Sequence, residues 1–147
     1  MTDDDLLAAE SGRCAFSDPD PFEIEAAGQQ FHFYPAGADR RDALFALVDS
    51  AQRQLDVCFY IFAEDTVSTA FRDRLVDAAR RGVTVTLIVD RFGSDATNKF
   101  LQPLVDAGGT FLCFSAKWTR RYLIRNHQKM VIADGQRAMF GGFNIAD

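Results

Sequence analysis

Residues 55–89 read LDVCFYIFAEDTVSTAFRDRLVDAARRGVTVTLIV, and this stretch decides the fold. Its two ends, at 55–62 and 83–89, are almost continuously apolar, as is typical of strands that other elements cover on both faces. Between them apolar residues recur at helical spacing, and Arg80-Arg81-Gly82 supplies the cations and the glycine that favour a helix C-terminus. The stretch therefore predicts two parallel strands joined by a right-handed helical crossover.

The same pattern analysis, continued toward both ends of the chain, predicts a layered α/β fold. The further elements are an edge hairpin with strands at 22–25 and 30–34, a helix at 39–54, a helix at about 96–106 and a strand at 110–114. We expect an α-β-α sandwich around a mixed, largely parallel sheet. No internal repeat or interior linker interrupts it, which predicts one domain at 22–147 behind an acidic flexible extension at 1–21.

Composition agrees with a single globular domain and shows where charge gathers. Of 147 residues 48% are apolar and 25% are charged, which excludes disorder and a coiled coil. The net charge of −5 is a property of the N-terminus, because residues 1–25 carry eight acidic side chains against Arg13 alone. Residues 117–137, by contrast, hold six basic side chains and one acidic one. The domain therefore has one basic patch.

The cysteines and the N-terminus bear on the cellular compartment. Cys14, Cys58 and Cys113 are far apart and odd in number, which favours reduced thiols over a disulfide framework or a zinc site. No signal peptide or membrane-spanning run of about 18 apolar residues is evident. We expect a cytoplasmic protein.

A hairpin is predicted near the C-terminus, where residues 126–144 read NHQKMVIADGQRAMFGGFN. Asp134-Gly135 lies between two β-rich runs, which is a strong signal for a two-residue turn. With that loop, Lys129 lies opposite Phe140 and His127 lies opposite Gly142. Seven extended residues separate Asp134 from His127 by about 20 Å, so we interpret Asp134 as a structural turn residue.

The predicted register gathers His127, Lys129 and Asn144 on one face at one end of the hairpin. An imidazole can attack phosphorus, while an ammonium and an amide N–H stabilise charge on the phosphate oxygens. Gly141 and Gly142 would let a phosphate approach the backbone closely. This combination of groups suits phosphoryl chemistry, and no residue pattern calls for a metal or a cofactor.

The pattern His127-x-Lys129-x4-Asp134, followed by Gly141-Gly142-x-Asn144, resembles the signature of the phospholipase D superfamily. Several earlier features occur in the order found in the N-terminal half of bacterial cardiolipin synthases. They are Tyr60-Ile61-Phe62 with Asp65, Arg81-Gly82-Val83, Asp90-x-x-Gly93-Ser94 and Ala107-Gly108. The resemblance covers about residues 22–147. It identifies the protein as similar to this superfamily throughout the predicted domain.

The resemblance implies a metal-independent exchange of phosphodiesters through a covalent phosphohistidine. His127 would be the nucleophile or its acid counterpart, and Lys129 and Asn144 would hold the phosphate. In a cardiolipin synthase the donor and the acceptor are both phosphatidylglycerol, and glycerol is released. The enzyme would then act peripherally at the inner face of the membrane.

One motif makes only half of such a site. The one other histidine, His32, has no lysine two residues on, so the resemblance implies a second motif from another repeat or from a second subunit. The chain also ends at Asp147, before the carboxylate that usually orients the histidine. We expect the sheet to be incomplete at the C-terminus and the chain to be the N-terminal half of a longer enzyme.

Three functions remain open on the sequence alone. The first is a phospholipid phosphatidyltransferase, the second a homodimeric phosphodiesterase that cuts nucleic acid, and the third a half-domain without catalysis. A basic and aromatic segment before the motif fits lipid headgroups and a nucleic-acid backbone equally, or is only a solvated face. Its members are Lys117, Trp118, Arg120, Arg121, Tyr122 and Arg125. Two carboxylates at predicted strand ends, Asp65 and Asp90, are either ligand-binding residues or helix caps.

Overall fold

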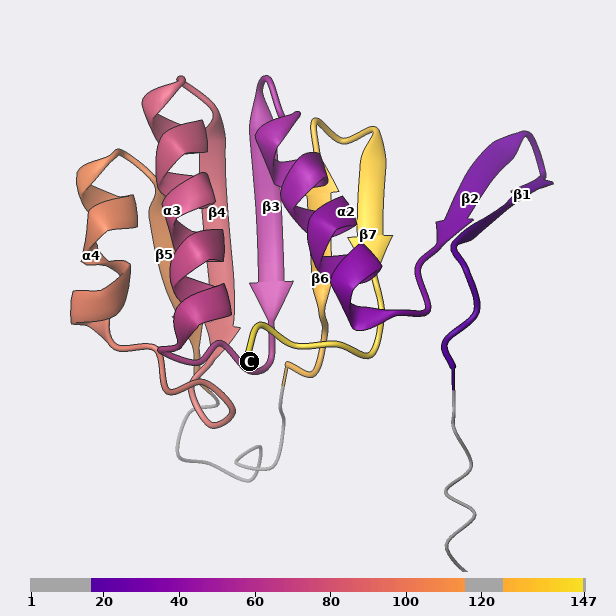
Figure 1. Cartoon of the computed structure of the whole chain (residues 1–147). Helices are drawn as coiled ribbons and strands as arrows, with labels where there is room; N and C mark the ends of the chain where they lie inside the picture. Colours follow the sequence, from indigo (N-terminus) through magenta and orange to yellow (C-terminus); the bar gives the residue numbers. More distant parts are fainter. Residues whose placement is uncertain (1–16, 116–125, 147) are drawn as a thin grey trace, which may run out of the picture. The chain divides into compact units, whose positions relative to one another are not determined.

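The computed structural model describes residues 17–115 and 126–146. The chain divides after Arg40 into two compact units, which are considered separately. Figure 1 shows the order of their helices and strands along the chain.

The first unit contains the predicted N-terminal hairpin. Strands β1 (Phe22–Ala26) and β2 (Gln29–Phe33) pair antiparallel. The turn places Ala27 at φ 51° and Gly28 at φ 71°. This is the left-handed conformation that the common two-residue hairpin turn requires at both of its central residues. The hairpin itself is confirmed. It was expected at the edge of the main sheet, however, and it instead forms a two-stranded sheet of its own.

The second unit is built on a five-stranded mixed sheet with the strand order β5-β4-β3-β6-β7. Its strands are β3 (Gln54–Phe59), β4 (Thr84–Asp90), β5 (Thr110–Phe114), β6 (Met130–Ala133) and β7 (Arg137–Phe140). The helices are α2 (Gly37–Asp49), which begins before the unit boundary, α3 (Thr66–Arg80) and α4 (Asn98–Asp106). Strands β3, β4 and β5 are parallel, whereas β6 runs antiparallel to β3 and β7 antiparallel to β6. The predicted α/β class with a mixed sheet is confirmed.

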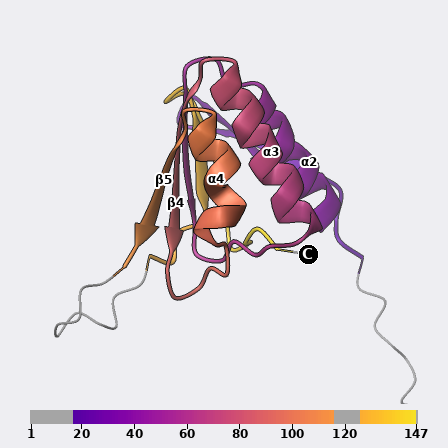
Figure 2. The ribbon, with the colours of Figure 1, turned by 90° about the vertical axis from the view of Figure 1, so that its left-hand side faces the viewer.

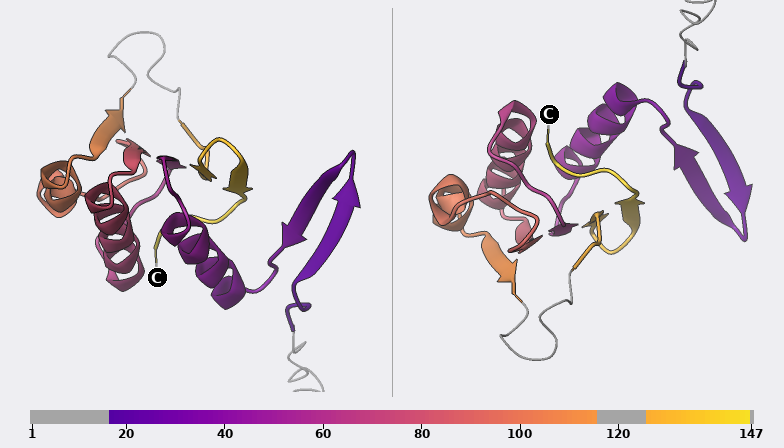
Figure 3. Two further views of the ribbon diagram at one scale, coloured as in Figure 1. Left: turned by 90° about the horizontal axis from the view of Figure 1, so that it is seen from above. Right: turned by 90° about the horizontal axis from the view of Figure 1, so that it is seen from below.

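The helices of the described residues all cover one face of this sheet (Figures 2 and 3). Alternate residues of the central strands point into the core on that side, and Leu55, Phe59 and Leu87 are fully buried there. On the other face Ile88 is half-buried and Leu112 is 49% exposed. The described residues thus form two of the three expected layers. None of the described helices combines the length and the apolar content that crossing a bilayer requires.

Helix α3 follows the prediction closely because its end signals are local. Asp65 is the N-cap, and its carboxylate accepts the Ser68 N–H at 2.8 Å. The helix ends at Arg80, with Arg81 as its C-cap and Gly82 at φ 91°, as the sequence indicated. Asp65 is therefore a helix cap in this structure.

Helix α2 ends at Asp49, five residues before the predicted end at Gln54. The backbone N–H groups of Gln52, Arg53 and Gln54 donate to the Asp134 carboxylate, so they cannot bond to carbonyls one helical turn earlier. A contact remote in sequence therefore ends the helix, and helical spacing could not reveal it.

The C-terminal hairpin forms, but the predicted register is wrong by one residue. Met130 pairs with Phe140 and Ala133 with Arg137, while the Gly141 N–H donates to the Lys129 carbonyl. Lys129 therefore lies opposite Gly141, not Phe140, and His127 is not opposite Gly142. The reason is the loop, in which the Gln136 N–H closes the turn onto the Ala133 carbonyl, so that Gln136 becomes a third loop residue.

The aromatic centre of the core allows a test of this packing. Phe71 of α3 is fully buried, and its ring contacts those of Phe45, Phe59 and Phe62. We predict that Phe71→Ala lowers the free energy of unfolding by about 3–5 kcal/mol, measured by urea denaturation, because it leaves a cavity. Phe140→Ala, at a side chain 70% exposed, should change it by less than about 0.5 kcal/mol. Equal effects of the two substitutions would contradict the assigned core.

Candidate active site

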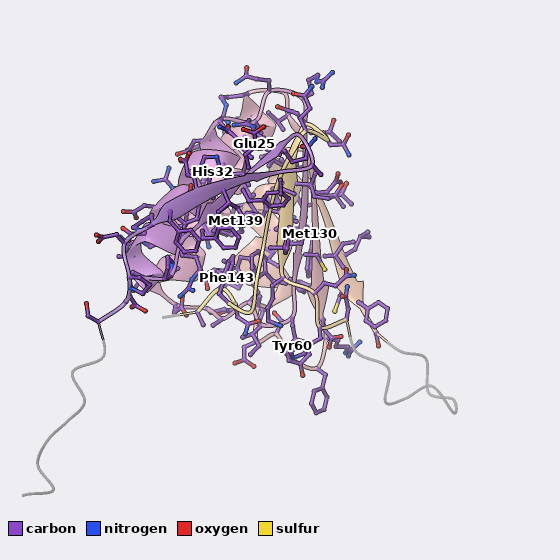
Figure 4. The ribbon with its side chains drawn as sticks, turned by 90° about the vertical axis from the view of Figure 1, so that its right-hand side faces the viewer. Glu25, His32, Tyr60, Met130, Met139 and Phe143 are labelled. Atoms are coloured by element: carbon purple, nitrogen blue, oxygen red, sulfur yellow. The ribbon has the colours of Figure 1, made fainter. Side chains whose placement is uncertain are left out.

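The direction of β6 decides where the motif lies. Because β6 is antiparallel to β3, its first residue pairs with the end of β3, in the pair Met130 and Cys58. Residues 127–129 therefore reach the edge at which the parallel strands end. In Figure 4 Tyr60, which follows β3, lies at this same end of the sheet. This is the edge at which open α/β sheets bind their ligands.

His127 and Lys129 meet there directly. The Lys129 Nζ lies 3.1 Å from the His127 Nδ1 and donates to the His127 carbonyl oxygen at 3.0 Å. An ammonium group has no lone pair, so Nδ1 is the acceptor. The neutral ring then carries its hydrogen on Nε2. His127 itself is exposed.

Lys129 is buried although it is charged. It continues the inward-facing row of Val131 and Ala133, which are fully buried, and it is itself only 6% exposed. Among the described residues no carboxylate lies within ion-pair distance of its ammonium. A buried charge is costly unless it is paired, so the position favours an anionic ligand.

Tyr60 completes this cluster, although the sequence assigned it no role. Its ring centroid lies 4.3 Å from that of His127, and the Lys129 Nζ lies 5.3 Å from the ring centroid, in reach of a cation–π interaction. Gly93 makes room for it, since a Cβ at Gly93 would lie 2.6 Å from the Tyr60 carbonyl oxygen and 2.8 Å from its ring. The motif Tyr60-Ile61-Phe62 was the one available sequence signal.

Asn144 lies at the same sheet edge but not by the predicted cross-strand route. Its Oδ1 accepts the Ile61 N–H at 3.1 Å, one residue from Tyr60. The next residue, Ile145, accepts from the Ala63 N–H and from the Ser68 hydroxyl, both at 3.0 Å. With Oδ1 occupied, the NH₂ group of Asn144 is the part that can donate to a ligand. Among the described residues no hydrogen bond joins Asn144 to His127.

The two glycines of the motif differ in their surroundings. A Cβ at Gly141 would lie 2.9 Å from the ring of Phe143, which itself packs 6.1 Å from the ring of Phe59. A Cβ at Gly142 would meet nothing within 4 Å. Figure 4 shows Phe143 between Met139 and the end of the sheet where Tyr60 lies. Gly141 therefore permits packing, whereas Gly142 leaves open space.

Asp134 lies at the opposite end of β6 and joins two turns. Its carboxylate accepts backbone N–H groups from Gln52, Arg53 and Gln54 at 3.1, 2.7 and 3.0 Å. These bonds, led by those from Gln54 and Arg53, hold the pKa of Asp134 below its ordinary value. The Asp134 backbone adopts φ 58°, in the left-handed region. This geometry is that of a structural residue.

The remaining candidate residues have other roles or lie outside the described part of the chain. Asp90 caps no helix, because its carboxylate accepts the N–H groups of Phe92 and Asn126. Among the residues that the structure describes, no three His, Cys, Asp or Glu side chains gather as a metal centre would require. The basic and aromatic segment lies outside the described residues; it comprises Lys117, Trp118, Arg120, Arg121, Tyr122 and Arg125.

Comparison with known proteins gives consistent matches. Residues 44–147 match a family model described as the PLD-like domain of cardiolipin synthase. Cardiolipin synthase A of Pseudomonas putida (strain W619) is 36% identical over 111 residues, which are 72% of this chain and 23% of that protein. The major cardiolipin synthase ClsA of Bacillus subtilis is 34% identical over 116 residues, 76% of this chain and 24% of that protein. The chain thus spans about a quarter of these relatives.

Solved structures show the same fold at lower sequence identity. Nuc of Salmonella typhimurium, a phospholipase D family member, superposes with a TM-score of 0.56 at 21% identity, over 72% of this chain and 64% of that one. NucT of Helicobacter pylori superposes with a TM-score of 0.59 at 17% identity, over 74% of this chain and 69% of that one. These likenesses concern the fold.

The structural assignment of Asp134 predicts a defined pH dependence. Asp134→Asn removes the ionised acceptor of three N–H groups, so the melting temperature should fall by several degrees at pH 7. The hydrogen bonds lower the folded-state pKa, so this contribution is present above about pH 4 and is lost as the pH falls through the lowered value. Melting curves of both proteins between pH 7 and pH 2 should therefore converge at the acid end. A constant difference would contradict the assignment.

Proposed function

We propose that this chain supplies one half of an active site that exchanges phosphodiesters. The premise is the family to which the chain belongs, that of the PLD-like domains of cardiolipin synthase. In this proposal His127, Lys129 and Asn144 act on the phosphate of an anionic phospholipid such as phosphatidylglycerol. The reaction is a phosphatidyl transfer through a covalent phosphohistidine. The same chemistry with water as acceptor is a phosphodiesterase reaction.

The observation that carries this proposal is the buried Lys129 ammonium beside the His127 ring. The described residues give it a carbonyl oxygen, a ring nitrogen and an aromatic face, but no anion. A phosphate oxygen would supply the missing negative charge. Since Lys129 and His127 are in contact, a phosphate held by the ammonium lies next to the imidazole. Binding of the phosphate by Lys129 therefore also places the phosphorus next to the ring that attacks it.

The proposed reaction takes place in two displacements. A ring nitrogen of His127 attacks phosphorus and forms a P–N bond, while the bond from phosphorus to the glycerol oxygen breaks. The departing glycerol oxygen takes a proton from the histidine of a second H-x-K motif. The hydroxyl of a second phosphatidylglycerol then loses its proton to that histidine and attacks phosphorus, and the P–N bond breaks. The Lys129 ammonium and the Asn144 amide stabilise the oxygens that carry charge.

The hydrogen bond at Nδ1 fits this sequence in a specific way. While Lys129 donates to Nδ1, the hydrogen of the neutral ring is on Nε2, so this nitrogen has no lone pair with which to attack phosphorus. A phosphate attracts the ammonium more strongly than a neutral imidazole does, so its arrival releases Nδ1. The hydrogen can then reside on Nδ1, which leaves a lone pair on Nε2 for attack. Phosphate binding thus converts the ring into a nucleophile.

The second H-x-K motif must come from outside the described residues of this chain. A further repeat in a longer protein or a second copy of the chain could supply it, and the relatives are about four times as long as the matched part. His32 lies in the separate N-terminal hairpin, with its Nδ1 2.8 Å from Glu23, and has no lysine beside it. It therefore serves as a control in the following experiment.

We predict that the chain releases glycerol from phosphatidylglycerol vesicles in excess chelator and that His127→Ala abolishes the release. His32→Ala, the matched substitution at the other histidine, should leave it unchanged. Both variants should melt within a few degrees of the parent, because both histidines are exposed.

Different failures of this experiment have different meanings. Cleavage of DNA in place of lipid, again dependent on His127, would make nucleic acid the substrate. A chain inactive on both substrates would show that two copies of it do not complete the site, and that the second motif has to come from a further repeat. Release that persists in His127→Ala would refute the assigned chemistry.

The two motif glycines allow the binding of phosphate to be separated from folding. Gly142→Ala has space for its methyl group, so it should keep the melting temperature and lower glycerol release by about tenfold if phosphate approaches there. Gly141→Ala would press on the Phe143 ring and should lower the melting temperature. Full activity in Gly142→Ala would show that no phosphate approaches this residue.

A further inference from the structure

Asp90 is a buried carboxylate that the proposed chemistry does not use. It ends strand β4, is 2% exposed, and divides its two oxygens between two backbone N–H groups. Its Oδ1 accepts from Phe92, two residues on, and its Oδ2 accepts from Asn126, 36 residues on, both at 2.8 Å. The second bond reaches the residue directly before His127.

Asn126 is held by its side chain as well. Its Nδ2 donates to the Cys58 sulfur at 3.1 Å, and its Oδ1 accepts the Gln128 N–H at 3.3 Å. Burial raises the pKa of the Cys58 thiol, so the sulfur that accepts this bond is a neutral thiol. Asn126 is therefore tied to the ends of two adjacent strands, β3 through Cys58 and β4 through Asp90. We call this set the Asn126 anchor: Asp90, Asn126 and Cys58.

The anchor works from the sheet face that lies away from the helices. Cys58 and Asp90 alternate with Phe59 and Val89, which point into the core on the helical side. The anchor thus lies on the sheet face opposite to the row formed by Lys129, Val131 and Ala133. They fix the main chain from which the His127 side chain extends.

The turn after β4 also shapes the other side of the His127 ring. The Ser94 N–H donates to the Asp90 carbonyl at 3.0 Å, and the Ser94 hydroxyl donates to the Phe62 carbonyl at 2.8 Å. This turn carries Gly93, whose missing side chain leaves room for Tyr60. One turn therefore holds the residue before His127 and admits the ring that packs against His127.

We propose that Asp90 is a positioning residue, which through the Asn126 anchor fixes the His127 imidazole against Tyr60 and Lys129. Its consequence for catalysis rests on the proposed function, whereas its consequence for the position of the ring does not. Asparagine in place of Asp90 has the same shape but offers one acceptor oxygen for two N–H donors, so it must release one of them.

The first test is an NMR measurement that needs no substrate. The chain has two histidines, and the aromatic ring current of Tyr60, 4.3 Å from His127, makes the His127 ring signals sensitive to small displacements. Loss of a signal in His127→Ala assigns it, and His32 is the internal reference. In Asp90→Asn the His127 ring signals should move while those of His32 stay in place.

A matched variant separates this effect from loss of stability. Thr97 caps α4 by accepting the Phe100 N–H at 3.1 Å, and Thr97→Ala also removes an acceptor of a backbone N–H. It should lower the melting temperature without moving the His127 signals. Unmoved His127 signals in Asp90→Asn, or equal movement in Thr97→Ala, would overturn the proposal.

A measurement on the unaltered chain keeps the proposal testable if Asp90→Asn does not fold. The Asn126 amide lies outside the strands, yet its bond to a buried carboxylate should make it exchange slowly with solvent. The Gln52 amide, which also donates to a carboxylate, provides a comparison at the other end of the sheet. Exchange of the Asn126 amide as fast as in an open loop would overturn the proposal.

Kinetics then connect the position of the ring with the reaction. With phosphatidylglycerol vesicles, Asp90→Asn should lower kcat by roughly ten- to a hundredfold with little change in KM, because a small displacement of a reacting group is costly. Thr97→Ala should keep kcat below its melting temperature. If the parent chain shows no turnover, two copies of the chain do not complete the site, and the NMR result alone decides the role of Asp90. An unchanged kcat in Asp90→Asn together with moved signals would refute the catalytic consequence.

Discussion

The antiparallel pairing of β6 with β3 is the constraint on which the candidate site depends. The three strands β3, β4 and β5 are parallel and end at one edge of the sheet, so a strand running with them would bring its own first residues to the opposite edge. Because β6 runs against them, the residues before it meet Tyr60 and Asp90 at that edge. The antiparallel direction of this one four-residue strand places the His127 imidazole and the Lys129 ammonium at the edge where the parallel strands end.

The spacing within the motif has a physical explanation in this pairing. His127 and Asp134 lie beyond the two ends of β6, and the strand between them crosses the core through Val131 and Ala133, both fully buried. Asp134 closes the hairpin onto the start of β3, through the amides before it. The two charged residues of the motif therefore have different roles. Lys129 belongs to the candidate site, whereas Asp134 stabilises the fold.

The sequence predicted the features that are local and missed those that depend on remote contacts. Strands and helices followed from periodicity and caps, and α3 between Asp65 and Gly82 matched closely. The hairpin register failed by one residue because Gln136 joined the loop, which the strong Asp134-Gly135 signal did not reveal. The meeting of His127 and Lys129 was predicted, but the contact of the Tyr60 ring with His127 joins residues more than 30 positions apart, as do the bonds of Asn126 to Asp90 and Cys58. No spacing rule in one sequence indicates such contacts.

The two buried charges of the described residues, Asp90 and Lys129, are not paired with each other, which supports the proposal that the site receives an anion. Asp90 and Lys129 are both nearly inaccessible to solvent. Both lie near Cys58, whose pKa is raised mainly by burial of the thiol and further by Asp90, whereas Lys129 lowers it. Paired with each other they would form a buried salt bridge, which would satisfy the ammonium and leave it little attraction for phosphate. Instead both oxygens of Asp90 accept backbone N–H groups at 2.8 Å. Strand alternation also places Asp90 and Lys129 on opposite faces of the sheet, and no carboxylate of the described residues pairs with the Lys129 ammonium. Asp90 therefore binds the chain before His127 and does not neutralise the charge of Lys129.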